Sequence, residues 1–334
     1  MRSAARVTVL TLCFCVLTLS WGQRCYGQST KKFPDKPVTF VVAFGVGGSA
    51  DRMTRLMARY IADELGQPIQ VINKPGAGTL LGANFLLSRP HDGYTVLASG
   101  FSPYLSNTIL DGSAKYSIKD FAYLNFQWFD EDIIALSKRS KYKTLGELMH
   151  AIKTQPKKVK GTVVRGSAGH LMAKMLLELN GIPQGNMNLV AYNDGGKPRA
   201  AVAGGVVDFI VISAQGSEAI SDYITPVAMV SDRRNSFWDA PTLPEALEPL
   251  GMSVPLIPGS IRGFATSAKT REKYPERFDI LTAAIERALK KPEVQKLLKR
   301  SSIGGRWIGP EESMQTMKSS FDIFKNYSYL LKLE

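Results

Sequence analysis

Apolar positions along the chain follow two different periods, and the first clear unit begins near residue 38. The run 38–44 (VTFVVAF) is apolar apart from Thr39, which is typical of a strand buried in a parallel sheet. After a glycine-rich turn, apolar residues recur at helical spacing from Met53 to Leu65, and Gly66 supplies a stop. Further elements of this unit are predicted at 68–73 (strand), 80–87 (helix) and 93–99 (strand). This order predicts a parallel sheet with right-handed crossovers.

The same alternation begins again near residue 132. Strands are predicted at 132–138, at the start of 161–170, at 187–193, at 207–213 and at 224–230, with helices at 144–156, from about 170 to 179 and at 198–205. Thr144 stands at the N-cap position of its helix with Glu147 three residues on, which predicts a capping box. The second stretch therefore forms an α/β unit of its own.

The last part of the chain returns to the first unit. The segment 254–267 reads as a returning strand, and a helix at about 275–290 precedes one or two more helices. We expect an α/β protein of two lobes, each a mostly parallel sheet flanked by helices. Residues 33–130 and 254–334 form the first lobe, and residues 131–253 form a second lobe inserted into it. Ligands of such folds bind in the crevice at the carboxyl ends of the strands.

The N-terminus has the layout of a secretory signal. Arg2 and Arg6 precede an apolar run over about 7–19, followed by small and polar residues. This run is shorter than the ~20 residues that a membrane-spanning helix needs. We predict that residues 1–27 are a signal peptide, cleaved after Gly22 or Gly27, and that the mature protein is periplasmic. A buried helix or a membrane anchor is the alternative.

Composition agrees with an exported globular protein. Of the 334 residues, 44% are hydrophobic and 21% are charged, and the formal net charge is +13. A basic total suits a nucleic acid, a membrane surface or an acidic solute, but the sequence contains no nucleic-acid motif. Cleavage after Gly27 removes Cys13, Cys15 and Cys25, which are all the cysteines. The three histidines are far apart, so we expect neither a metal site nor a cofactor.

The loop 44–51 (FGVGGSAD) contains the first candidate chemistry. It lacks the dinucleotide-binding spacing, because Asp51 stands where a third glycine is expected, and it lacks the lysine of a phosphate loop. Backbone amides at the start of the following helix still favour an anion, and Ser49 is a candidate N-cap or ligand donor. A tight turn without a ligand is the alternative.

A second loop of similar type occurs at 165–170 (RGSAGH). Two anion-binding loops facing one another across a cleft suit a solute with a carboxylate at each end. Arg165 either adds a charge-assisted contact or is a solvated surface residue. A secreted hydrolase using Ser167 and His170 is a competing hypothesis, but a nucleophile elbow requires glycine where Arg165 stands.

A long ordered set of segments resembles one known family. The segments are FPDKPVTFVVAFGVGGSADRMTRLMARYIADELGQPIQVINKPGAGTLLGANFL with HDGYTVLASG, GSAGHL, VAYNDGGKPRAAVAGGVVD, VSDRR with APTLPEAL, and IRGFATSA. They closely resemble the extracytoplasmic solute receptors of tripartite tricarboxylate transporters, the Bug-type binding proteins. The resemblance implies a type II periplasmic-binding-protein fold that closes around a small carboxylate and delivers it to a membrane permease. It also implies a monomer without catalytic activity.

The family's binding positions transfer to named residues of this chain. The first loop serves one carboxylate through Phe44, Gly47, Gly48, Ser49 and Asp51, and the next loop contributes Gly76, Ala77 and Gly78. The facing loop serves the second carboxylate or the distal end of the ligand through Ser167, Ala168, Gly169 and His170, and Arg165 beside it is a further candidate from the residues alone. The remaining expected site residues are Tyr192, Gly195, Gly196 and Asp208. Asp51 would repel a carboxylate at close range, so we expect it to act through water or on a ligand donor group.

Departures from the family pattern concern both loops. Ala43 stands where the family usually has proline, and Ala50 where it often has a hydroxyl residue. Val164 and Arg165 stand where family members commonly have small residues. Ligand identity therefore stays open among dicarboxylates, tricarboxylates, amino acids, aromatic acids and amides. A sensor that presents its liganded form to a signalling partner is the alternative to a transport receptor.

Overall fold

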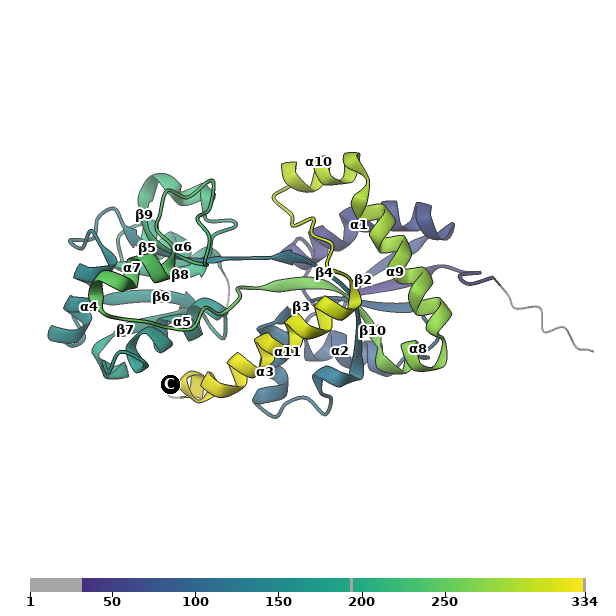
Figure 1. Cartoon of the computed structure of the whole chain (residues 1–334), viewed down its shortest axis with the longest axis horizontal. Coiled ribbons are helices and arrows are strands. Elements are labelled where there is room, and N and C mark those ends of the chain that lie inside the picture. The colour runs from purple at the N-terminus through teal and green to yellow at the C-terminus, as the bar shows by residue number, and fades with distance from the viewer. Residues whose placement is uncertain (1–31, 193–194, 333–334) are drawn as a thin grey trace, which may run out of the picture.

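The apolar runs of the sequence form two separate five-stranded sheets, one in each lobe (Figure 1). The structure is a computed structural model and describes residues 32–192 and 195–332. The first sheet has the order β2-β1-β3-β10-β4, and the second has the order β7-β6-β8-β5-β9. The predicted signal segment, residues 1–27, lies outside the described residues, and its cleavage stays a prediction.

The strand boundaries follow the predicted apolar runs closely. The first sheet consists of β1 (Val38–Val42), β2 (Ile69–Asn73), β3 (Thr95–Ser102), β4 (Phe121–Phe129) and β10 (Ile261–Ser267). The second consists of β5 (Asp132–Ser137), β6 (Lys160–Val164), β7 (Asn188–Tyr192), β8 (Phe209–Ser213) and β9 (Ile224–Val230). The sequence analysis did not predict β4, and β10 begins seven residues after the start of the predicted strand at 254.

Each sheet contains one strand that runs against the others. β1 pairs in parallel with β2 and β3, whereas β10 is antiparallel to β3 and β4. In the second sheet β6 pairs in parallel with β7 and β8, whereas β5 is antiparallel to β8 and β9. The reversed strands, β5 and β10, are those that enter from the other lobe. They start at the edge where the other strands end, so the carboxyl ends of the remaining strands face the space between the lobes.

Helices cover both sheets. They are α1 (Ser49–Leu65), α2 (Leu80–Leu87), α3 (Tyr104–Leu110), α4 (Leu145–Thr154), α5 (Ala168–Glu178), α6 (Gly196–Ala203), α7 (Leu243–Leu247), α8 (Ala268–Lys273), α9 (Pro275–Lys290), α10 (Pro292–Arg300) and α11 (Gly309–Tyr327). Gly66 ends α1 in the left-handed conformation at φ 65°, as predicted. Among the described helices, none is long and apolar enough to cross a membrane.

One predicted cap is only half formed. The Thr144 side chain accepts a hydrogen bond from the Glu147 backbone N–H, but the Glu147 carboxylate accepts from Lys143 N–H and not from Thr144. The predicted helix start near His170 also moves, since α5 begins at Ala168 with Ser167 as its N-cap.

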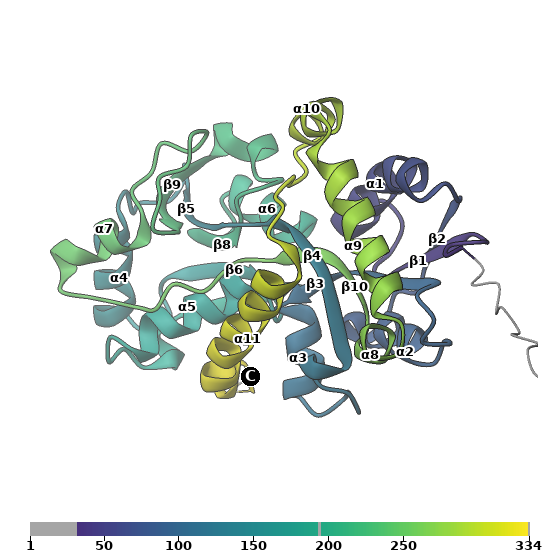
Figure 2. The same cartoon turned by 45° about the vertical axis from the view of Figure 1, so that its right-hand side comes forward.

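The C-terminal segment connects the two lobes. Helix α11 packs against β4 in the first lobe, and the short helix η6 (Ser328–Lys332) packs against α5 in the second. Phe324 and Leu330 are buried in the hydrophobic core that lies under the second sheet. Figure 2 shows α11 lying across the junction of the lobes. We propose the division into 33–130 with 254–334 and 131–253, with the end of α11 and η6 packed on the inserted lobe.

Candidate ligand-binding cleft

The N-terminus of α1 opens into the space between the lobes. Its N-cap is Gly48, which has no side chain, and no other side chain caps this helix end. The first hydrogen bond of the helix runs from Arg52 N–H to Gly48 O at 2.9 Å. The backbone N–H groups of residues 49–51 therefore have no acceptor within the helix. Gly48, Ser49 and Arg52 line the cavity. This end of α1 therefore offers backbone donors and a helix dipole to an anion.

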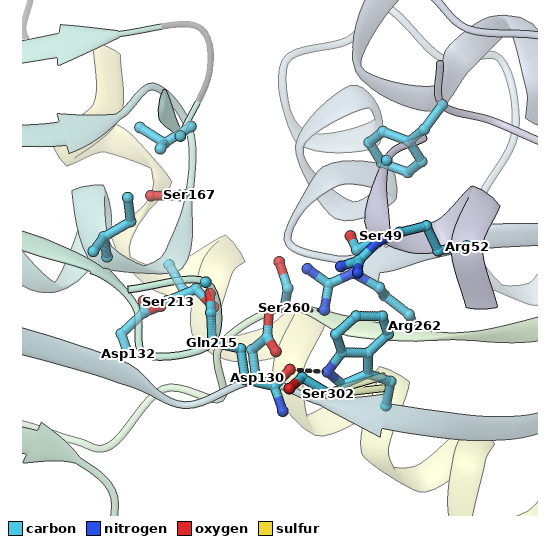
Figure 3. Close-up of a pocket in the computed structure, with 18 of the residues that line it drawn as sticks. Ser49, Arg52, Asp130, Asp132, Ser167, Ser213, Gln215, Ser260, Arg262 and Ser302 are labelled. Atoms are coloured by element: carbon cyan, nitrogen blue, oxygen red, sulfur yellow. Dashed lines mark hydrogen bonds and ion pairs between the residues drawn. The ribbon is translucent and has the colours of Figure 1, made fainter. Parts of the chain in front are cut away.

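The N-terminus of α5 opens into the same cavity from the other lobe. Ser167 accepts a hydrogen bond at 3.1 Å from His170 N–H, and Ser167 and Ala168 line the cavity. Val164, at the end of β6, and Arg165 lie beside them. Figure 3 shows Ser49 and Arg52 on one side of the cavity and Ser167 on the other. Two helix N-termini thus face one another across a volume of about 760 Å³.

The two segments that connect the lobes form the floor of the cavity. Asp130 N–H donates to Ser260 O at 2.9 Å, so the two segments are hydrogen-bonded where they cross. A Cβ on Gly259 would lie 2.3 Å from Asp130 O, so this crossing requires glycine there. Arg262 Nη1 lies 2.7 Å from Asp130 Oδ2, and its guanidinium stacks over the Trp128 ring at 4.5 Å from the ring centroid.

Two hydrogen bonds join the lobes beside the cavity. Trp128 Nε1, at the end of β4, donates to Gln215 Oε1 in the loop after β8. Asn107 Nδ2 on α3 donates to Gly166 O at 2.7 Å in the loop before α5. Both bonds connect residues at the edges of the cleft, so they fix the spacing of the lobes in this state.

Asp132, the first residue of β5, is the other acid on the floor. Burial, and to a smaller extent the neighbouring Asp130, raise the pKa of its carboxyl to about 7, although Arg199 and Arg262 act in the opposite direction. Only 5% of Asp132 is exposed. Its carboxyl group therefore changes charge near neutral pH, unlike an ordinary aspartate.

Arg199 holds the second-lobe loop in place. Its guanidinium donates to the backbone oxygens of Gly195, Ser213 and Gln215 at 3.0 to 3.1 Å and to Ser217 Oγ at 3.0 Å. Burial lowers the pKa of this guanidinium below its ordinary value. Arg199 thus shapes the wall of the cavity, and most of its donors are already occupied by the protein.

Asp51 supports the first loop from inside the lobe. Its carboxylate is 2% exposed and accepts from Gly47 N–H at 2.9 Å, from Arg55 Nε at 3.0 Å and from Asn73 Nδ2 at 2.8 Å. Asn73 Nδ2 also donates to Phe44 O at 3.0 Å. Burial alone would raise the pKa of Asp51, but the hydrogen bonds from Arg55, Gly47 and Asn73 outweigh it and hold the pKa below its usual range.

We expect Asp51→Asn to lower the free energy of unfolding by about 2 kcal/mol at pH 7, because hydrogen bonds to a charged acceptor are lost. The folded-state pKa of Asp51 is depressed, so its stabilisation exists above the unfolded-state value and is lost as pH falls through the folded-state value. The difference from wild type should therefore shrink below about pH 4. Urea denaturation at several pH values measures it. Asp63→Asn, at an exposed position of the same helix, is the control and should show no such difference.

The expected site residues divide into two groups. Those that line the cavity are Phe44, Gly48, Ser49, Arg165, Ser167, Ala168 and Gly195. Those that do not line it are Gly47, Asp51, Gly76, Ala77, Gly78, Gly169, His170, Tyr192, Gly196 and Asp208. Asp208 accepts from Lys160 N–H at 2.9 Å where β6 and β8 begin, which is the edge of the sheet away from the cavity.

Ser167 and His170 do not form the arrangement of a nucleophile and its base. Ser167 Oγ accepts from His170 backbone N–H, and His170 Nδ1 accepts from Gly166 N–H at 3.2 Å. The imidazole is 1% exposed. In the described part of the chain, no group of three or more histidine, cysteine, aspartate or glutamate residues could hold a metal ion.

Several lining residues were missed by the sequence analysis. They are Arg52, Tyr104, Trp128, Asp130, Asp132, Arg199, Ile212, Ser213, Gln215, Gly216, Glu218, Ser260, Arg262, Arg300, Ser301 and Ser302. Most lie where a strand ends or a crossing begins, so the rule that ligands bind at the carboxyl ends of strands was the available signal. Arg300 at the end of α10, with Ser301 and Ser302 after it, carries no such signal.

A model of one protein family matches residues 53–326, and its description is tripartite tricarboxylate transporter family receptor. The chain belongs to this family. As a member of it, the protein is a periplasmic solute-binding receptor, and the resemblance read from the sequence is confirmed. Protein BugT of Bordetella pertussis is 29% identical over 223 residues, which cover 65% of this chain and 68% of BugT.

Solved structures share the fold of this receptor. A TctC solute-binding protein from Polaromonas, without ligand, has a TM-score of 0.73 and 23% identity, covering 89% of this chain and 99% of that one. MatC from Rhodopseudomonas palustris, with bound malate, has a TM-score of 0.69 and 23% identity, covering 90% and 100%. The predicted two-lobed α/β fold is therefore confirmed.

Proposed function

We propose that this receptor binds a small carboxylate between its lobes and delivers it to the membrane permease of a tripartite tricarboxylate-type transporter. The observation that carries the proposal is the pair of helix N-termini, of α1 and α5, on opposite walls of one cavity. Each favours a negative group, so together they suit a ligand with an anionic group at each end. Malate bound to MatC, a protein of the same fold, is such a ligand.

Charge and volume support a small anion. Five arginines line the cavity against three acids: Arg52, Arg165, Arg199, Arg262 and Arg300 against Asp130, Asp132 and Glu218. The volume of about 760 Å³ lies in the usual range for small-molecule sites. Binding energy gained by contacts to both walls favours the closed arrangement of the lobes. We further propose that the receptor acts as a monomer with no chemistry of its own.

A ligand screen tests this function. We expect at least one dicarboxylate to raise the melting temperature of the mature protein, since a hundredfold excess over Kd adds ~2.7 kcal/mol. Titration calorimetry then gives Kd, and the ligand recovered by mass spectrometry should be unchanged. Absence of any shift across mono-, di- and tricarboxylates and amino acids would overturn the proposal. Turnover of the ligand would favour the hydrolase.

Arg52→Gln should weaken binding of the ligand found in that screen about tenfold, because a charge-assisted contact at the N-terminus of α1 is lost. Arg59→Gln is the matched control, since Arg59 is exposed on the same helix and does not line the cavity. Equal Kd values for the two variants in calorimetry would show that Arg52 makes no contact with the ligand.

A further inference from the structure

Two buried carboxylates on the floor of the cavity have unused acceptor capacity. Asp130 is 4% exposed and Asp132 is 5% exposed, and both line the cavity. Arg262 occupies Asp130 Oδ2, but Asp130 Oδ1 has no hydrogen-bond partner among the described residues. No hydrogen bond to the Asp132 carboxylate is found in the described part of the chain. Burying a carboxylate that accepts no hydrogen bond costs free energy. A hydrogen-bond donor on a ligand would lower that cost, so the floor favours a ligand with such a donor.

The protein's own cations do not supply this donor. Arg262 is committed to Asp130 and to the Trp128 ring. Arg199 donates hydrogen bonds to four oxygen atoms of its own lobe. The negative charge of Glu218 also favours the charged form of its guanidinium and raises its pKa. Tyr104 and Ser260 also line the cavity beside the floor.

The position of Asp132 beside α5 indicates which ligand group reaches it. A Cβ built on Gly169 would lie 3.2 Å from Asp132 Oδ2, so this carboxylate adjoins the first turn of α5. The same turn offers N–H groups to an anion, and Figure 3 shows Asp132 on the Ser167 side of the cavity. A site that binds anions and a carboxylate that binds cations are therefore neighbours, which is the arrangement that complements a carboxylate and an ammonium attached to the same carbon atom.

We propose that the ligand is a small amino acid, most fittingly an aminodicarboxylate, whose ammonium group is held by Asp132 with Asp130 behind it. Its α-carboxylate lies at the N-terminus of α5, and its distal carboxylate lies at the N-terminus of α1 beside Arg52. This inference rests on the proposed function and narrows its ligand class. The charges then balance, because the acids on the floor face the ligand's cation and the two helix N-termini face its anions.

Proton exchange accompanies this mode of binding. Asp132 is partly protonated near neutral pH in the free protein, and an ammonium beside it favours the carboxylate. Binding would release the proton of Asp132 to solvent while the ligand keeps its own. Affinity for the amino ligand should therefore rise between pH 6 and 8. The other charged or titratable groups near Asp132 are Asp130, Arg199, Arg262, Tyr104 and, one residue from Gly169 on α5, His170.

Matched ligand pairs test the proposal on the intact mature protein. Calorimetry compares glutamate with glutarate and aspartate with succinate, at pH 6, 7 and 8. We expect the better amino ligand to bind at least about tenfold more tightly than its partner, since a hydrogen bond between charged groups is gained. Asp132→Asn should abolish this ratio and its pH dependence, because the amino ligand then binds about tenfold more weakly. Asp279→Asn, at an exposed position on α9, is the net-charge control and should retain both.

Each outcome decides between the ligand classes. Tighter binding of the dicarboxylate of each pair, with an unchanged ratio in Asp132→Asn, would overturn the inference and leave the carboxylate receptor intact. Failure of all four compounds and of the wider carboxylate screen would overturn both proposals. If Asp132→Asn does not fold, the wild-type ratio and its rise with pH remain as the test, and a flat ratio near one contradicts the inference.

Discussion

Replacing Arg262 with methionine is expected to lower the free energy of unfolding by about 3 kcal/mol. The substitution keeps a flexible apolar stem against Trp128 but removes the guanidinium that lies 2.7 Å from the buried Asp130 carboxylate. An uncompensated buried charge is strongly destabilising, and breaking such a pair costs about 3–5 kcal/mol. Urea denaturation followed by tryptophan fluorescence measures the loss.

A surface pair and a double variant provide the controls for this experiment. Arg271→Met removes an ion pair of 3.1 Å to Glu311 whose two side chains are 50% and 80% exposed, and it should cost no more than ~1 kcal/mol. Asp130→Asn combined with Arg262→Met should recover much of the lost stability, because the orphaned charge is gone. Equal losses for Arg262→Met and Arg271→Met would show that the floor pair is no stronger than a solvated one.

Gly169→Ala is expected to cost about 1–3 kcal/mol and to weaken ligand binding. The added Cβ would lie 2.5 Å from Val211 O, and this atom belongs to the backbone of β8 in the centre of the second sheet. No change of rotamer relieves such a contact, so the first turn of α5 must move away from the sheet. The N–H groups of that turn, which face the cavity, move with it.

The matched control is Gly185→Ala in the same lobe, where nothing lies within 4 Å of the new Cβ and the backbone is not left-handed. It should leave stability and Kd unchanged within error. Thermal unfolding and calorimetry on both variants separate the two sites. A Gly169→Ala protein with wild-type stability and affinity would show that α5 tolerates the displacement and that its position is not tightly set.

The elements that the sequence predicted well are those with a clear period. The run 38–44, which is apolar apart from Thr39, contains β1, and the apolar stripe from Met53 to Leu65 became the buried face of α1. The strand β4 was missed although 121–129 is rich in aromatic residues and apolar apart from Asn125 and Gln127. It is buried on both faces and so has no alternation, which makes its type ambiguous from sequence.

From the sequence, only those parts of the candidate site that belong to a local sequence motif could be predicted. The loops at 44–51 and 165–170 lead into helices, and their glycines and serines indicate a helix N-terminus of the kind that favours an anion. Asp130 and Arg262 are 132 positions apart, and only the crossing of two segments brings them together. For Asp51, the sequence predicts its position in the loop motif. It does not predict that the carboxylate is buried and hydrogen-bonded to Arg55 and Asn73.

The attachment of the C-terminal segment to both lobes constrains how the cleft can open. Two covalent segments alone would allow the lobes to twist about the line that joins them as well as to bend toward one another. Helix α11 is fixed to the first lobe, while Phe324 and Leu330 are buried in the second. It acts as a third tether. Opening and closing are therefore restricted toward a single path. We expect liganded and empty receptors to differ most in α11 between Met317, which is buried in the first lobe, and Phe324, which is buried in the second.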